Sequence, residues 1–106
     1  MTEGYVVILS TAPTAEQAAA LARTLVEERL VACVNVLPIA RSIYRWQGQI
    51  VDEPEQLCLM KTRADHVEAL RARLTALHPY AVPELLVLDV RSGHEPYLSW
   101  IDASLA

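Results

Sequence analysis

The sequence is poor in the residues that build several kinds of enzyme site. Three of its 106 residues are glycine, two are cysteine and none is phenylalanine. With glycine only at Gly4, Gly48 and Gly93, the chain cannot form a glycine-rich phosphate loop or a GxSxG nucleophile turn. Cys33 and Cys58 are too few for a disulfide framework, and we expect reduced thiols. Nothing in this composition signals catalysis, so we expect a protein that is not an enzyme.

Long apolar runs and an excess of positive charge are also missing. The longest unbroken apolar runs, such as Tyr5–Leu9 and Leu30–Val34, have five residues, whereas a membrane-spanning helix needs about 20. Lys and Arg number 9 against 13 Asp and Glu, for a net charge of −4, which argues against nucleic acid as a partner. The first residues, Met1–Gly4, lack the basic region of a signal peptide. We therefore expect a cytoplasmic protein without membrane or nucleic-acid partners.

The apolar content is high for so short a chain. Residues 1–106 are close to the common size of a single domain, 53% of them are hydrophobic, and the mean hydropathy is +0.22. These values exclude a disordered chain. The share of hydrophobic residues is also higher than the core of a lone small domain would need.

Two helices are predicted from capping patterns and apolar periodicity. Tyr5–Leu9 is apolar on consecutive positions and predicts a strand buried on both faces. Thr14 and Gln17 then form a capping box for a helix that ends near Arg29. Asp65 is the expected cap of a second helix, which Pro79 stops just after His78.

A long hairpin is predicted between these helices. Residues 32–46 and Gln49 to Thr62 are strand-like and are joined by a tight turn at Gln47-Gly48. Pro38 marks a bulge or an edge, and Pro54 interrupts the second arm. Each arm has about 14 residues, beyond the usual limit of about ten, so we expect the hairpin to project from its own domain.

The last strand and a closing helix complete the pattern. Glu84 to Val90 reads as a strand that is apolar on both faces, and Pro96 fits the start of a helix whose apolar residues are Tyr97, Trp100, Ile101 and Leu105. The order βαββαβ predicts an α+β sandwich of ferredoxin-like type with both longer helices on one face of the sheet. The other face needs a cover, which we expect to be another copy of the chain; the alternative is the terminal helix.

Six linked motifs resemble the CutA family of divalent-cation tolerance proteins. In order and spacing they cover residues 5 to 105: Leu9-Ser10-Thr11-Ala12-Pro13, Ala32-Cys33-Val34-Asn35, Ser42-x-Tyr44-x-Trp46-x-Gly48-x-Ile50, Lys61-Thr62, His78-Pro79-Tyr80-x-Val82-Pro83-Glu84 and Tyr97-Leu98-x-Trp100. The resemblance implies a homotrimer similar to the PII signalling proteins, with the long hairpin reaching neighbouring subunits. It also implies tolerance to copper and other divalent metals, no catalytic reaction and no tightly bound cofactor.

His78 is the main candidate metal ligand. Imidazole suits Cu(II) and Zn(II), and some family members place ligands at this position. The alternative is a histidine that interacts with the end of its helix. Members proposed to bind copper have a cysteine where this chain has Ser10 and a second histidine where it has Leu77, so one ligand of three remains.

The cysteines are weaker candidates for metal binding. Cys33 is a possible ligand, although a buried free cysteine usually behaves as a small apolar residue. Cys58 and Met60 alternate onto one strand face and could offer sulfur to Cu(I), or belong to the core.

The hairpin and the strand ends carry the remaining candidates. Tyr44 and Trp46 are expected to pack into a neighbouring subunit, while Asp52, Glu53 and Glu55 could bind hard cations or form a solvated edge. Lys61, Tyr80 and Glu84 could line a cleft between subunits. By analogy with PII proteins, such a cleft could sense a small molecule or an anion; a structural scaffold for a protein partner is the third alternative.

Overall fold

The computed structural model describes residues 4–106, except the side chain of Ile39. The expectation drawn from Met1–Glu3 lies outside the described residues. The elements in chain order are β1 (Tyr5–Ala12), α1 (Ala15–Glu27), β2 (Cys33–Trp46), β3 (Gln49–Arg63), the 3-10 turn η1 (Ala64–His66), α2 (Val67–Leu77), β4 (Leu86–Asp89) and α3 (Glu95–Leu105).

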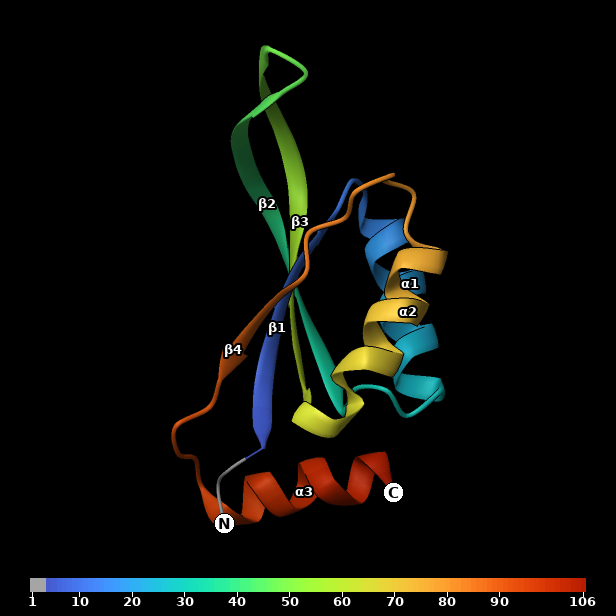
Figure 1. Ribbon diagram of the computed structural model, residues 1–106, viewed down its shortest axis with the longest axis vertical. Coiled ribbons are helices and arrows are strands. Elements are labelled where there is room, and N and C mark those ends of the chain that lie inside the picture. The colour runs from blue at the N-terminus through green and yellow to red at the C-terminus, as the bar shows by residue number, and fades with distance from the viewer. Residues whose placement is uncertain (1–3) are drawn as a thin grey trace.

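The four strands form one antiparallel sheet in the order β2-β3-β1-β4. Helices α1 and α2 lie side by side against one face of this sheet, and α3 crosses the end at which β1 begins (Figure 1). This arrangement confirms the predicted ferredoxin-like α+β sandwich.

The two longer helices begin in different ways. The Oγ1 atom of Thr14 accepts a hydrogen bond of 3.1 Å from the backbone N–H of Gln17, as the capping box predicts. The predicted Asp65 cap is wrong, because η1 precedes α2 and no side chain caps that helix. The Asp65 carboxylate instead lies 2.8 Å from Nδ1 of His66 and 3.7 Å from Arg63, which compete with the backbone for it.

The predicted hairpin is confirmed and projects beyond the rest of the molecule (Figure 1). Gln47 and Gly48 have φ values of 50° and 78°, and two successive left-handed residues make the turn that fits twisted strands. The register shifts between Leu37 and Ala40, which confirms the bulge at Pro38. Pro54 does not interrupt β3. Since β1 pairs with β3 only from Gln56 onward, Pro54 lies where one strand edge is open and a missing N–H is tolerated.

The last strand is shorter than predicted. β4 has four residues, Leu86–Asp89, instead of the seven from Glu84 to Val90. The flanking residues still follow β1, because the Ser10 hydroxyl donates to the Glu84 carbonyl and the Val90 N–H donates to the Tyr5 carbonyl.

The two faces of the sheet differ in cover. The face toward α1 and α2 holds a core in which Ile8, Cys58, Met60, Leu70 and Leu74 are fully buried. Cys58 and Met60 therefore belong to the core, and burial raises the pKa of the Cys58 thiol.

The opposite face is apolar and open. Register places Leu9 beside Leu59 and Leu86, with Leu88 one row further along. Leu86 and Leu88 are 54% and 49% exposed. We name this row of leucines, with Val7 and Leu57, the open sheet face.

The terminal helix does not cover the open sheet face. Leu98, Ile101 and Leu105 of α3 pack against Tyr5 and Ala32 at the end of the sheet. The predicted apolar side of this helix is wrong in part, because Tyr97 and Trp100 point to the surface, where their rings lie 5.5 Å apart.

Candidate functional site

A groove separates the projecting hairpin from the connector at residues 79–84. It has a volume of about 880 Å³, within the usual range of small-molecule sites. The hairpin contributes Tyr44, Trp46 and Glu55, and the connector contributes Tyr80 and Glu84. Strand alternation explains the hairpin set, since beyond the bulge the even-numbered residues of β2 share a face with the odd-numbered residues opposite them on β3. We call this cavity the hairpin groove.

Glu55 is the most buried charged residue at the hairpin groove. Its exposed fraction is 5%, and the Tyr80 hydroxyl donates a hydrogen bond of 2.6 Å to its Oε2 atom. Burial of Tyr80 and this hydrogen bond raise the pKa of the phenol well above its usual value. Between residues 4 and 106, no Lys, Arg or His side chain forms an ion pair with Glu55.

His78 holds the connector that forms one wall of the hairpin groove. It is 8% exposed, and it adopts the extended conformation typical of a residue before proline. Its Nδ1 accepts a hydrogen bond of 3.1 Å from the N–H of Tyr80. Nε2 must then carry the ring proton, which it donates to the Thr11 carbonyl at 2.6 Å. His78 thereby fixes the connector to β1 and holds Tyr80 above Glu55.

These contacts occupy both nitrogens of the proposed metal ligand. A metal ion on His78 would have to replace the Tyr80 N–H at Nδ1 or the proton at Nε2. The Ser10 hydroxyl donates a hydrogen bond of 2.8 Å to the Glu84 carbonyl.

The other candidate ligand, Cys33, lies far from His78. Thr11, the partner of His78, pairs with Leu57, while Cys33 pairs with Lys61, about 13 Å further along the strands. The Cys33 thiol is partly exposed, 3.9 Å from the Tyr97 hydroxyl. Across the described chain, no three His, Cys, Asp or Glu side chains are grouped so as to hold a metal ion.

Of the three residues expected in a cleft, two line the hairpin groove. Tyr80 and Glu84 are part of its wall. Lys61 lies six residues after Glu55 on the same strand, about 20 Å away along β3. Within one chain the lysine is separated from the other two.

The hairpin carboxylates are also separated from each other. The Arg41 guanidinium binds Asp52 through two hydrogen bonds of 2.8 and 2.7 Å and lowers the pKa of that carboxyl. Glu53 is exposed, whereas Glu55 is buried under Tyr80. Sequence analysis missed the buried role of Glu55. The alternation that puts Glu55 on the same face of the hairpin as Tyr44 was available as a signal, but the contact with Tyr80 of the connector was not.

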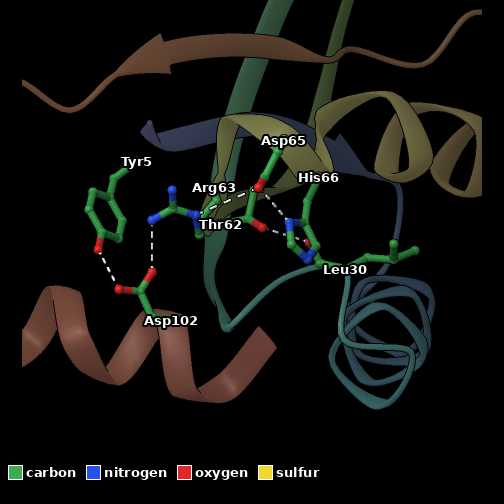
Figure 2. Close-up of polar contacts among 7 residues, drawn as sticks. All are labelled: Tyr5, Leu30, Thr62, Arg63, Asp65, His66 and Asp102. Atoms are coloured by element: carbon green, nitrogen blue, oxygen red, sulfur yellow. Dashed lines mark hydrogen bonds and ion pairs between the residues drawn. The ribbon is translucent and has the colours of Figure 1, made fainter. Parts of the chain in front are cut away.

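A second tyrosine–carboxylate contact stands at the opposite end of the sheet, shown in Figure 2. The Tyr5 hydroxyl donates to Asp102 at 2.7 Å, and Arg63 donates to the other oxygen of this carboxylate at 2.8 Å. The hydrogen bond from Tyr5 and the charge of Arg63 lower the pKa of Asp102. This cluster ties α3 to β1 and β3. Nearby, Thr62 donates to the Leu30 carbonyl and closes the connection after α1.

The fold is a ferredoxin-like α+β sandwich with a projecting hairpin and a groove beside it. Known proteins are similar to it along nearly the whole chain. The family model described as CutA1 divalent ion tolerance protein matches residues 6–104. The divalent-cation tolerance protein CutA of Thermus thermophilus is 48% identical over 95 residues, which cover 90% of this chain and 92% of that protein. The chain therefore belongs to the CutA1 divalent ion tolerance family.

Solved structures agree with this assignment. CutA from Xylella fastidiosa has a TM-score of 0.95 and 45% identity, with 98% of this chain and 100% of that chain covered. The periplasmic divalent cation tolerance protein CutA from Archaeoglobus fulgidus has a TM-score of 0.93 and 32% identity, with 96% and 99% covered. The relatives are named as tolerance proteins and not as enzymes. Residues 4–106 contain no helix that is long and apolar enough to span a membrane.

Proposed function

We propose that the chain is a single-domain, cytoplasmic, non-catalytic divalent-cation tolerance protein that acts as a homotrimer and binds copper or other divalent ions weakly. The open sheet face is the observation that carries the assembly. Family membership supports the link to divalent cations.

The open sheet face favours association of identical chains. Burying apolar surface contributes about 25 cal/mol per Å², and an uncovered apolar sheet is prone to uncontrolled pairing. A second copy offers a surface of the same apolar character, whereas α3 is already packed elsewhere. Tyr44 and Trp46 are 39% and 47% exposed, which leaves them available for the predicted contact with a neighbour.

Sedimentation equilibrium tests the trimer. We expect wild type at micromolar concentration to have about three times the chain mass of 11.8 kDa. Leu88→Glu places a charge on the open sheet face and should dissociate the assembly. Val26→Glu is the matched control, because Val26 is an exposed apolar residue on α1. A monomeric wild type would refute the assembly.

Weak metal binding follows from the position of His78. Copper has the highest affinity of the divalent first-row metals for nitrogen ligands, but here it must displace one of the two hydrogen bonds of the ring. Ser10 and Leu77 offer neither a thiolate nor an imidazole to complete a copper site.

A competitive Cu(II) titration tests the metal site. His78→Gln keeps an acceptor and a donor for Tyr80 and Thr11 but removes the imidazole, so we expect it to weaken Cu(II) binding. His94→Gln, in the exposed stretch before α3, is the control and should bind like wild type. Equal binding by wild type and His78→Gln would show that His78 is not the ligand.

The alternative function, sensing of a small molecule or anion between subunits, stays a prediction. It needs a neighbouring chain to bring Lys61 near Tyr80 and Glu84. Co-purification of a metabolite with the trimer, together with loss of that metabolite in Lys61→Met, would favour it over metal binding.

A further inference from the structure

The open sheet face carries a lysine among its apolar residues. Lys61, the single lysine of the sequence, pairs with Val7, which also pairs with Leu88, so the three side chains share this face. Lys61 is partly buried. In the part of the chain that the structure describes, no carboxylate forms an ion pair with it. The next basic residue on this face, Arg63, is already bound to Asp102.

The same side of the sheet carries a negative charge without a cation. Glu55 lies six residues before Lys61 on β3, and because side chains alternate, both belong to one face. Glu55 is 5% exposed and accepts a hydrogen bond from Tyr80, but none of the described basic side chains pairs with it. A separation of about 20 Å along the strand keeps the two charges of one chain apart. Each chain thus has opposite, uncompensated charges at the two ends of one face.

Association of identical chains can bring these two ends together. The subunits of a cyclic trimer contact one another through two different patches, so each chain offers one patch to one neighbour and the other patch to the next. Covering this side of the sheet also removes water from both charges, and a buried charge without a partner costs several kcal/mol. The register that places the lysine of one chain against the glutamate of another is therefore favoured.

The hairpin groove has a lining that suits a lysine side chain. Its charged lining residues are Glu55 and Glu84, and Tyr44, Trp46 and Tyr80 supply aromatic surface. The methylene groups of a lysine can pack against aromatic carbon while the ammonium group reaches a carboxylate. The hairpin aromatics that we expect to contact a neighbour would then enclose the lysine of that neighbour.

We infer that the Lys61 ammonium group of one subunit enters the hairpin groove of a neighbouring subunit and pairs with the Glu55 carboxylate there. This inference rests on the proposed trimer and goes beyond it, because it assigns the charges that set the register of the open sheet faces. Complementary charges across an interface fix its register and disfavour other arrangements. The pair also opposes the sensing alternative, since it leaves Lys61 unavailable to an anion.

A double-mutant cycle in the assembled protein tests the ion pair. Glu55→Gln keeps an acceptor for Tyr80, and Lys61→Met keeps an unbranched stem. Each leaves one buried charge unpaired, so each should raise the trimer dissociation constant by about tenfold or more per interface. The double variant leaves neither charge and should dissociate less readily than either single variant. Sedimentation equilibrium, at a urea concentration that partly dissociates wild type, compares the four proteins.

Glu53→Gln is the matched control. It removes an exposed glutamate two residues from Glu55 on the same side of the hairpin, so its effect should be less than about twofold and additive with that of Lys61→Met. Additive effects of Glu55→Gln and Lys61→Met in a trimeric protein would overturn the inference and leave the assembly intact. A monomeric wild type would refute the proposed assembly itself.

Carbodiimide cross-linking of wild type is a second measurement that needs no variant. The reagent joins an amine to a carboxylate in contact with it, and Lys61 is the single lysine. We expect mass spectra of the covalent dimer to contain Lys61 joined to Glu55, a link that the separation of about 20 Å forbids within one chain. A dimer in which Lys61 is joined to a different carboxylate, such as Glu84, would overturn the inference.

Discussion

Two tyrosine–carboxylate pairs, at opposite ends of the sheet, have similar geometry and different surroundings. Tyr5 donates to Asp102 at 2.7 Å and Tyr80 donates to Glu55 at 2.6 Å. Arg63 neutralises Asp102, whereas Glu55 has no such partner within residues 4–106. The first pair completes a structural contact between α3 and the sheet. The second leaves a carboxylate beside the hairpin groove that no cation within residues 4–106 neutralises.

The difference shows that a hydrogen bond alone does not define a site. Both carboxylates accept from a phenol, but only one is compensated in charge. A compensated group stabilises the chain that contains it, while an uncompensated buried group is stabilised further by a ligand of opposite charge.

Of the changes that test this comparison, removal of the phenol hydroxyls should change the free energy of unfolding most. Tyr80→Phe leaves the buried Glu55 carboxylate without its donor and should lower the free energy of unfolding by about 1 to 3 kcal/mol. Tyr5→Phe should have a smaller effect, because Asp102 keeps Arg63 and contact with water. Chemical denaturation of the two variants measures both. A larger loss in Tyr5→Phe would contradict the assignment of Glu55 as the more dependent carboxylate.

Conversion of each carboxylate to its amide should change stability in opposite directions. Asp102→Asn removes the charge that Arg63 faces, so its unfolding midpoint should fall by a few degrees. Glu55→Gln removes a buried charge that has no cation in its own chain and keeps the Tyr80 bond, so in the dissociated chain its midpoint should stay the same or rise. Thermal unfolding at neutral pH and low salt, with both variants made in Leu88→Glu, decides between them. A fall of equal size in both variants would mean that Glu55 has a cationic partner within its own chain.

Acidification should change the stability least, and it should act through Asp102, the carboxylate that Arg63 neutralises. The folded-state pKa of Asp102 is lowered by Tyr5 and Arg63, so its stabilising contribution is complete above the unfolded carboxyl pKa of about 4. This contribution is lost as the pH falls through the lower folded value. The stability difference between wild type and Asp102→Asn should therefore shrink from pH 5 to about pH 2. A constant difference over this range would exclude Asp102 as its source.

Local signals along the sequence were sufficient for most elements. The Gln47-Gly48 turn and the Thr14 cap depend on residues within three positions of each other, and both are confirmed. The Asp65 cap failed although its pattern was equally regular, because Arg63 and His66 bind the same carboxylate. A short pattern predicts structure only where no other partner competes for its side chain.

The candidate site was predicted less completely than the fold. The cleft between subunits expected at Lys61, Tyr80 and Glu84 stays a prediction; within one chain, Tyr80 and Glu84 line the hairpin groove and Lys61 lies elsewhere on β3. Glu55 looked like one of three equivalent hairpin carboxylates. Its burial depends on Tyr80, which is 25 residues later in the sequence, and no local pattern contains that contact.

The sequence by itself determined the order of strands and helices, the long hairpin and the excess of apolar residues, because these depend on periodicity and turn chemistry that act over a few positions. The tertiary structure alone decided which apolar face is left open, that His78 uses both nitrogens to hold the connector, and that Glu55 is buried without a cation. These features arise where segments distant in sequence meet, and the free energy of a charge depends on the groups that surround it in space.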